Sequence, residues 1–342
     1  MTPLERLPLP LLEWYRDNAR SLPWREEPTP YHVWLSEIML QQTRVAAVLE
    51  YYRRFLDEVP DIEALAALPE ERLLKLWQGL GYYNRARNLQ AAARQITEQY
   101  GGAFPSDYDA VRGLKGIGDY TAGAICSIAF GQCVPAVDGN VLRVVSRITG
   151  DSSDIALPAT KKRVAEQLRE IIPIHAPGTF TQAMMELGAT VCLPNGVPQC
   201  SRCPAAGFCA AHIEGRTGEL PVKSPGRARR VEERTVWLIF SGGRVALRRR
   251  PDKGLLAGLW EYPNEPGSGV PEGVQIAASE FGCTAKHIFT HIEWHMTARI
   301  ASAADDRLPD GWVWADRAAL RDRYAVPNAF SGLTYLVEER VK

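Results

Sequence analysis

The spacing of apolar side chains changes once along the chain. Through the first 215 residues they recur every three or four positions, as in residues 31–59 and 70–101, with short breaks at proline or polar residues. This spacing predicts amphipathic helices. Further on, apolar and polar residues alternate, which is typical of strands. We expect strands over 235–240, 244–250, 287–300 and 311–315, and then one helix over 316–324.

Residues 216–234 separate the two patterns. They show no periodicity and are rich in Gly, Pro and Arg, so we expect a linker there. With 342 residues and 46% hydrophobic content, the chain can bury more than one core. We therefore predict a multidomain protein with an all-α region over 1–215, the linker, and a smaller α+β domain over 235–342.

Charge is balanced overall but not locally. The chain has 40 Lys and Arg against 40 Asp and Glu, yet residues 223–253 carry ten basic residues and three acidic ones. Such a stretch fits either contact with an acidic polymer or a solvated linker. No apolar run approaches the roughly 18 residues of a membrane helix, and the N-terminus lacks a signal-peptide pattern. We expect a cytoplasmic protein whose seven cysteines form no disulfide framework.

Four of the seven cysteines cluster within 18 residues. They are Cys192, Cys200, Cys203 and Cys209, separated by intervals of seven, two and five. Two C-x-x-C pairs would indicate structural zinc, but only one C-x-x-C occurs here. Four close thiolates also suit an iron–sulfur cluster. The alternative of four unrelated buried cysteines fits such close spacing poorly.

The stretch GLKGIGDYTAGA, residues 113–124, predicts a helix–hairpin–helix. Gly116 and Gly118 permit close backbone approach, and their amides precede the next helix. This geometry binds a phosphate without reading sequence. Lys115 lies in the turn itself and can add a phosphate contact.

Two carboxylates carry the candidate chemistry. Glu37 shares a helix face with Val33, Trp34 and Leu40, where desolvation would raise its pKa as a general acid requires. The ordinary alternative is a partly exposed helix glutamate. Asp138 precedes an apolar-periodic helix, whose amides and dipole would keep it ionised; a simple N-cap is its ordinary role. One neutral and one charged carboxyl suit acid-assisted cleavage of a glycosidic bond.

Several motifs together resemble a known family. The hairpin, the VDGNV that follows it and the four-cysteine loop resemble the endonuclease III superfamily of helix–hairpin–helix DNA glycosylases. The segments LPWR (22–25), WLSEIMLQQTRV (34–45), LGYYNRARNL (80–89) and FTQAMMELGA (180–189) resemble its MutY family of adenine DNA glycosylases. The likeness covers nearly the whole chain, with the motifs in order.

The resemblance implies an enzyme that flips adenine out of a mispair with 8-oxoguanine or guanine in double-stranded DNA. Glu37 matches the general acid at adenine N7, and Asp138 matches the carboxylate that stabilises the oxocarbenium ion or bonds to it transiently. The other matching residues are Asn140 and Tyr120, which support that step, Trp24, Arg25 and Glu186, which contact adenine, and Gln42 and Tyr82, which enter the base stack. Those last two have ordinary alternatives as a helix-surface amide and a core aromatic.

The resemblance also bears on the reaction's end point and on the cofactor. Bifunctional relatives carry a Schiff-base lysine where this chain has Tyr120, so we expect it to stop at an abasic site. The four cysteines match the ligands of a 4Fe-4S cluster, although the first interval is seven residues where the family usually has six. The hairpin has Lys115 where proline is frequent.

The C-terminal domain resembles the Nudix-like module of the same family, through GLLAGLWEYPN (254–264) and HIFTHIEWHM (287–296). Phe289, Thr290 and His291 match the loop that probes 8-oxoguanine; otherwise they form a strand-end turn. A Nudix hydrolase needs a glutamate-rich metal-binding box, and residues 272–282 lack it. We therefore expect lesion recognition, not pyrophosphate hydrolysis.

Three other functions compete with adenine excision. A pyrimidine-directed glycosylase or lyase conflicts with Tyr120 and with the C-terminal domain. A catalytically silent DNA-binding protein has no need of Glu37 and Asp138, and a nucleotide pyrophosphatase needs the missing box. We expect a monomer of bacterial type that works on the nucleoid.

Overall fold

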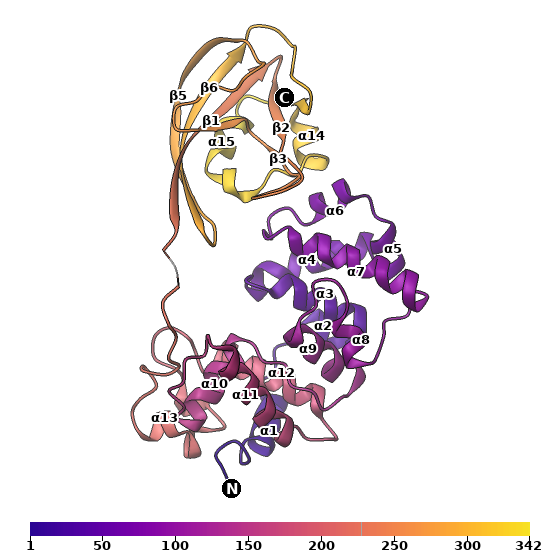
Figure 1. Cartoon of the computed structure of the whole chain (residues 1–342), viewed down its shortest axis with the longest axis vertical. Coiled ribbons are helices and arrows are strands. Elements are labelled where there is room, and N and C mark those ends of the chain that lie inside the picture. Colours follow the sequence, from indigo (N-terminus) through magenta and orange to yellow (C-terminus); the bar gives the residue numbers. More distant parts are fainter. Residues whose placement is uncertain (227) are drawn as a thin grey trace. The chain divides into compact units, whose positions relative to one another are not determined.

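The computed structural model describes residues 1–226 and 228–342. Arg227, which belongs to the predicted linker and basic stretch, lies outside the described residues. The chain divides into two compact units: the first comprises residues 1–67 and 88–225, and the second comprises residues 68–87 and 226–342 (Figure 1). The first is all-helical and the second is built on a β-sheet.

Helices of three to five turns dominate the first unit, as the 3.6-residue spacing predicts. The helices, short ones included, are α1 (Pro8–Asn18), α2 (Pro23–Glu26), α3 (Pro30–Leu40), α4 (Val45–Glu58), α5 (Ile62–Ala67), α7 (Asn84–Tyr100), α8 (Tyr108–Arg112), α9 (Asp119–Phe130), α10 (Gly139–Thr149), α11 (Pro158–Ile171), α12 (Pro177–Thr190) and α13 (Ala210–Ile213). The first turn of α7, residues 84–87, belongs to the second unit. Two 3-10 turns, η1 (Cys200–Arg202) and η2 (Ala206–Phe208), lie in the cysteine-rich loop.

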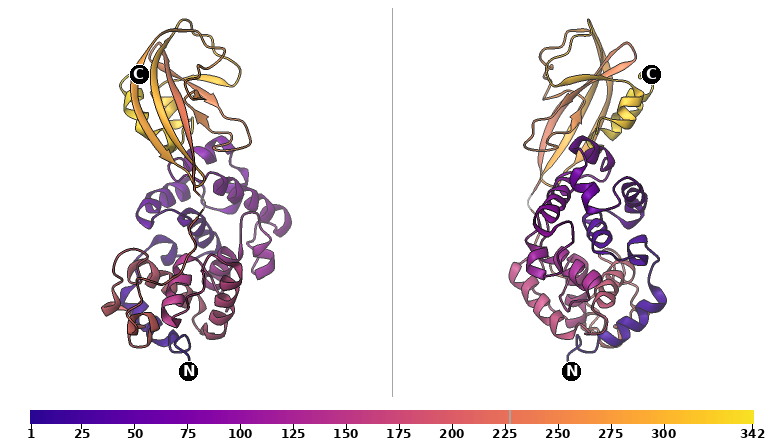
Figure 2. Two further views of the ribbon diagram at one scale, coloured as in Figure 1. Left: turned by 60° about the vertical axis from the view of Figure 1, so that its left-hand side comes forward. Right: turned by 90° about the vertical axis from the view of Figure 1, so that its right-hand side faces the viewer.

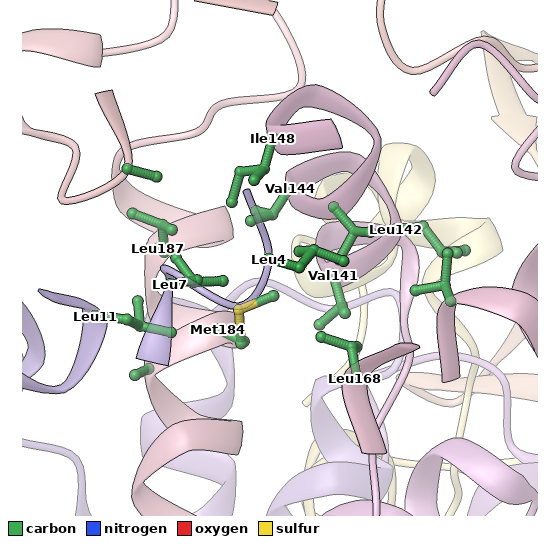
Figure 3. Close-up of a cluster of buried hydrophobic side chains, with 14 of the residues drawn as sticks. Leu4, Leu7, Leu11, Val141, Leu142, Val144, Ile148, Leu168, Met184 and Leu187 are labelled. Carbon is green, nitrogen blue, oxygen red and sulfur yellow. The ribbon is translucent and has the colours of Figure 1, made fainter. Parts of the chain in front are cut away.

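One core of this unit lies where α1 meets α10 and α12. Leu7 and Leu11, one helical turn apart, are fully buried there together with Val144, Ile148 and Leu187 (Figure 3). The N-terminal segment therefore closes the core formed by helices from the far end of the unit. That packing fixes α10 and α12, which carry two of the candidate site's carboxylates.

The predicted hairpin is present. Helix α8 ends at Arg112, α9 begins at Asp119, and Leu114 and Ile117 are buried in the turn between them. Gly116 has φ +77°, and a Cβ there would lie 2.6 Å from the Cβ of Asn88. Glycine is needed at this position for both reasons.

The second unit is a mixed seven-stranded sheet with short helices. Its elements are β1 (Arg230–Ser241), β2 (Arg244–Arg249), β3 (Trp260–Glu261), β4 (Asn264–Pro266), β5 (Ile276–Ile288), β6 (Ile292–Ala303), β7 (Trp312–Ala315), α6 (Glu70–Leu76), α14 (Arg317–Asp322), η3 (Asn328–Leu333) and α15 (Thr334–Glu338). The strand order is β3-β2-β1-β6-β5, with β4 pairing β1 and β7 pairing β2. Strands β1 and β6 are parallel, and the other pairs are antiparallel.

The alternation in β1 places apolar residues on both faces of the sheet. Val236 and Leu238 face one core, which Phe330 of η3 and Leu336 of α15 complete. The C-terminal helical segments, coloured yellow, cover one face of the sheet (Figure 2, right). Trp237 and its neighbours on the other side form a smaller cluster. Among the described residues, no helix combines the length and apolar character that crossing a bilayer requires.

The structure corrects the predicted linker over 216–234. Leu220 is buried in the first unit's core, and the backbone of Val222 accepts a hydrogen bond from Ile155 (3.0 Å). At the other end, residues 230–234 are already part of β1. The loss of periodicity marked the boundary between the two parts but made the linker too long. A segment that packs without regular secondary structure has no period and resembles a linker in sequence.

Residues 70–101, predicted as helical with short breaks, form two helices, α6 and α7, which are separated by a turn over residues 77–83. The predicted all-α region over 1–215 needs correction, because α6 groups with the sheet unit rather than with residues 1–67. Residues 276–282, compared above with the Nudix box, lie in β5. The strand predicted over 287–300 is the end of β5, a turn, and most of β6.

Candidate active site

A cavity of about 630 Å³ lies in the helical unit. It brings together residues from α2, α3, α9, α10 and α12. The site residues predicted from the sequence that line it are Trp24, Arg25, Glu37, Gln42, Gly116, Gly118, Tyr120, Asp138, Asn140 and Glu186. Segments more than 160 residues apart in the chain thus converge on one space, large enough for a nucleobase and its sugar.

Glu37 is buried near the middle of α3, with 7% of its surface exposed. Its Oε2 accepts a hydrogen bond of 2.6 Å from the Tyr120 hydroxyl. Burial raises the pKa of Glu37 to about 7, the Tyr120 hydrogen bond opposes this rise, and the charge of Asp138 adds to it. A carboxyl in this state can hold a proton at neutral pH and give it up.

Asp138 caps α10. Its Oδ1 accepts a hydrogen bond from the Val141 amide (2.8 Å), and its Oδ2 accepts one from the Asn140 side chain (2.8 Å). The carboxylate is therefore held in one orientation by its own helix terminus. The N-cap role and the catalytic role are compatible, because Asp138 also lines the cavity with Glu37.

Asn140 is itself held from behind by a buried arginine. Arg143 donates hydrogen bonds to the Asn140 side-chain oxygen (2.9 Å), to the Gly188 carbonyl (2.8 Å) and to the Cys192 carbonyl (2.8 Å). Periodicity marked Arg143 only as part of an apolar helix, so nothing in the sequence pattern singled it out. Its contacts tie α10 to α12 and to the cysteine-rich loop.

Glu186 is fully buried on α12 and paired with two arginines. Arg20 reaches both of its oxygens (2.5 and 2.9 Å), and Arg25 reaches Oε2 (2.7 Å). Burial alone would raise the pKa of Glu186, but these hydrogen bonds outweigh burial and lower it. Arg20 was not predicted to belong to the site. The signal in the sequence was its place two residues before the LPWR motif.

Trp24 is buried in α2 and makes an edge contact with Tyr52, with ring centroids 5.2 Å apart. Arg25 stacks over Tyr15 at 5.6 Å. These contacts hold one wall of the cavity in place before any ligand enters. Lys115, in contrast, is exposed in the hairpin turn and does not line the cavity.

Backbone strain coincides with the residues predicted to enter the base stack. Among the described non-glycine residues, φ is positive at Gln42 (57°), Tyr82 (47°) and Leu256 (56°). Gln42 is exposed and lines the cavity, whereas Tyr82, 48% exposed, lies in the second unit. Both side chains are presented to solvent from conformations that cost free energy, which is common at functional sites.

Phe289, Thr290 and His291 form the tip of the β5–β6 hairpin. The Phe289 ring contacts His287 (4.5 Å between centroids) and Trp294 (4.9 Å). Thr290 and His291 are exposed. The residues do form a strand-end turn, and its aromatic support leaves two polar side chains facing outward.

The four clustered cysteines line one small, largely apolar cavity beside α10 and α12. The Arg147 guanidinium lies 3.3 Å from the Cys192 sulfur, and the Cys209 thiol donates to the Arg147 carbonyl (3.2 Å). In the seven-residue interval, residues 194–197 bulge into solvent while Gln199 hydrogen bonds back to Val191 (2.9 Å). The longer interval therefore does not remove Cys192 from the cavity.

The chemistry of the donor set fits an iron–sulfur cluster, because four thiols line a shared cavity and thiolates are the usual ligands of such a cluster. Burial raises the pKa of Cys203 to about 12, so thiolates here need a cationic group beside them.

Comparison with known proteins agrees with this architecture. Residues 35–174 match the HhH-GPD superfamily of base excision DNA repair proteins, and residues 235–334 match the NUDIX domain. The helical part is similar to a thermostable thymine-DNA glycosylase (28% identity, 62% of this chain and 97% of that chain, TM-score 0.57). It is also similar to endonuclease III trapped on DNA (26% identity, 63% and 99%, TM-score 0.53).

Curated relatives match across both units. The chain is 34% identical to the adenine DNA glycosylase of Mus musculus, over 87% of this chain and 70% of that protein. It is 37% identical to the adenine DNA glycosylase of Homo sapiens, over 74% of this chain but only 56% of the human protein. This chain therefore belongs to the adenine DNA glycosylases, a family of N-glycosidic bond hydrolases built on the HhH-GPD fold and carrying a Nudix-like C-terminal domain.

Proposed function

We propose that this protein excises adenine mispaired with 8-oxoguanine or guanine in duplex DNA and leaves an abasic site. The observation that carries the proposal is the cavity in which a buried Glu37, hydrogen bonded to Tyr120, lies with the fixed carboxylate of Asp138. A pair of acids with different environments is what glycosidic bond cleavage requires.

The two acids have separate tasks. Protonated Glu37 donates its proton to N7 of the flipped adenine, which makes the base a better leaving group. Positive charge then develops on the sugar, and Asp138 stabilises the oxocarbenium ion by charge or by a transient bond. Asn140 and the Val141 amide hold the Asp138 carboxylate during that step.

The reaction stops after base loss. A Schiff base needs an amine, and the described residues that line the cavity include two arginines but no lysine. Tyr120 takes the position of the lysine of bifunctional relatives, and its hydroxyl is committed to Glu37. A phenol cannot form the imine that leads to strand cleavage.

Recognition uses both units. Trp24, Arg25 and Glu186 contact the extruded adenine, while Gln42 and Tyr82 fill the base stack that it leaves. Phe289, Thr290 and His291 probe the opposite base. The amides of Gly116 and Gly118, with Lys115, hold a backbone phosphate. The protein works as a monomer in the cytoplasm, and its partner is duplex DNA with an adenine mispair.

A 4Fe-4S cluster held by Cys192, Cys200, Cys203 and Cys209 completes the proposal. These four thiols would join the two ends of the loop over residues 192–209 through the bound cluster. We expect the Cys203→Ser variant to purify with less iron and sulfide per chain than the wild type. The matched Cys283→Ser variant, changed in the sheet unit, should keep the wild-type content. Equal content in the two variants would remove Cys203 from the ligand set.

The excision reaction is tested with duplexes that hold adenine opposite 8-oxoguanine, guanine or thymine. Strand breaks are scored with and without hot alkali. We expect breaks only after alkali and only in the first two duplexes. Breaks without alkali would contradict the role of Tyr120, and binding without breaks in any duplex would favour a silent DNA-binding protein.

A further inference from the structure

Residues 68–87 belong to the sheet unit, although they precede it by some 140 residues. The Lys75 ammonium, on α6, is central to this attachment. It donates to the Leu320 carbonyl (2.8 Å), to the Tyr324 carbonyl (3.2 Å) and to the Gln78 side chain (2.5 Å). Two of these acceptors are carbonyls at the C-terminal end of α14, where a cation is most favourable.

A second pair of hydrogen bonds holds the turn that follows α6. The Gln78 amide donates to the Val326 carbonyl (2.8 Å), and the Asn328 amide donates to the Gly79 carbonyl (2.8 Å). The turn contains three residues with positive φ: Gly79 (107°), Gly81 (69°) and Tyr82 (47°). Contacts to the sheet unit therefore stabilise a strained backbone.

The turn presents Tyr82 to the tip of the β5–β6 hairpin. The Tyr82 hydroxyl lies 3.3 Å from the Thr290 hydroxyl. On the other side, the Arg85 guanidinium lies 5.5 Å from the centroid of the Tyr82 ring. An aromatic side chain from the helical region and the hairpin tip thus form one exposed surface within one unit.

We propose that Lys75 is a positioning residue that makes Tyr82 part of the lesion-reading surface of the sheet unit. This inference rests on the proposed function and adds to it. The Nudix-like domain carries the hairpin tip and also holds Tyr82, the aromatic side chain proposed to enter the base stack, beside that tip. Lys75 acts through Gln78 and the backbone of the turn that follows it. Loss of its ammonium would leave the turn held by the weaker neutral hydrogen bonds of Gln78 and Asn328.

The test compares Lys75→Met with Lys75→Arg in the full-length protein. Lys162→Met is the matched control, because Lys162 is exposed and has one surface partner at 3.9 Å. The first readout needs no substrate: amide hydrogen exchange across residues 79–83. We expect faster exchange in Lys75→Met, wild-type exchange in Lys162→Met, and partial recovery in Lys75→Arg.

The second readout is discrimination. The dissociation constant is measured for duplexes with an abasic-site analogue opposite 8-oxoguanine and opposite guanine, and the guanine value is divided by the 8-oxoguanine value. Lys75→Met should lower this ratio by about fivefold, the size of a typical coupling between neighbouring groups. In a Tyr82→Ala background the same substitution should change the ratio no further.

An unchanged ratio and unchanged exchange in Lys75→Met would overturn the inference. So would an equal drop in the ratio with and without the Tyr82 side chain, since that result indicates a general structural loss. A wild-type protein that neither discriminates nor excises adenine would instead contradict the proposed function. In that case the exchange experiment would still decide whether Lys75 holds the turn.

Discussion

At the residue scale, Glu37, the proposed general acid, shows how burial and a hydrogen bond oppose each other in setting the pKa of a carboxyl group. Without Tyr120, desolvation would push the pKa of Glu37 still higher and the acid would hold its proton too firmly. Burial raises the pKa of Tyr120 well above its ordinary value, and the nearby charges of Glu37 and Asp138 add to the rise. Tyr120 therefore stays a hydrogen-bond donor over the whole working range of pH.

Replacing Glu37 by Gln should abolish proton donation while keeping the shape of the site. We expect single-turnover adenine excision to fall by at least about 100-fold, the usual contribution of a general acid. Binding to the mispaired duplex should change little. In the wild type, excision should decline as pH rises through about 7, where Glu37 loses its proton. A pH-independent rate over the range 6 to 9 would contradict this assignment.

The raised pKa of Glu37 also predicts a stability effect. A carboxyl whose pKa is higher in the folded than in the unfolded protein stabilises the fold below its unfolded value, and this stabilisation is lost as pH rises through its folded value. Wild type should therefore lose stability between pH 4.5 and about 7 relative to Glu37→Gln. Urea unfolding at pH 8 should show the variant more stable by about 2 kcal/mol. A gap that is the same at pH 4.5 and pH 8 would exclude this cause.

At the element scale, the sequence predicted those parts of the site that local rules control. An acid on the apolar face of a helix and an aspartate before a helix are local patterns, and the structure places Glu37 and Asp138 as those patterns indicate. Arg20 could not be found this way, because its partner Glu186 is 166 residues away. Likewise, periodicity predicted helix over 70–101 but not the position of the turn between α6 and α7, where Gly79 and Gly81 have positive φ.

The close approach of α10 and α12 gives a prediction at this scale. A Cβ added at Gly188 would lie 2.7 Å from the Cβ of Asn140, so the two helices would have to separate. We expect Gly188→Ala to destabilise the protein by about 1–3 kcal/mol and to reduce excision by shifting Asn140 and Asp138. Gly218→Ala, with open space around its Cβ, is the control and should leave both quantities unchanged. Unfolding curves and excision rates that coincide for the two variants would show that α10 and α12 can accommodate the added methyl group without separating.

At the scale of the whole molecule, the two units divide the work. The helical unit holds the cavity with the paired acids, and the sheet unit holds the hairpin tip and the Tyr82 turn. The fold class could be predicted from the change in periodicity, because the helical spacing of the first part implies an all-α region and the alternation of the second part implies a sheet. The grouping of residues 68–87 with the sheet unit did not, because it depends on hydrogen bonds between segments some 250 residues apart.

The Nudix-like fold should carry no Nudix chemistry. Glu261, 1% exposed, is paired with Arg248 (2.9 Å) and with Arg250, and Glu265 is paired with Arg248 (2.7 Å). These carboxylates are already neutralised by arginines. Incubation with nucleoside triphosphates and Mg²⁺ or Mn²⁺ should therefore release no pyrophosphate. Pyrophosphate release that survives Glu37→Gln but is lost in Glu261→Gln would contradict this expectation and place a second active site in the sheet unit. Glu261 also holds Arg248 and Arg250, so the unfolding curve of Glu261→Gln must match that of the wild type for this conclusion to stand.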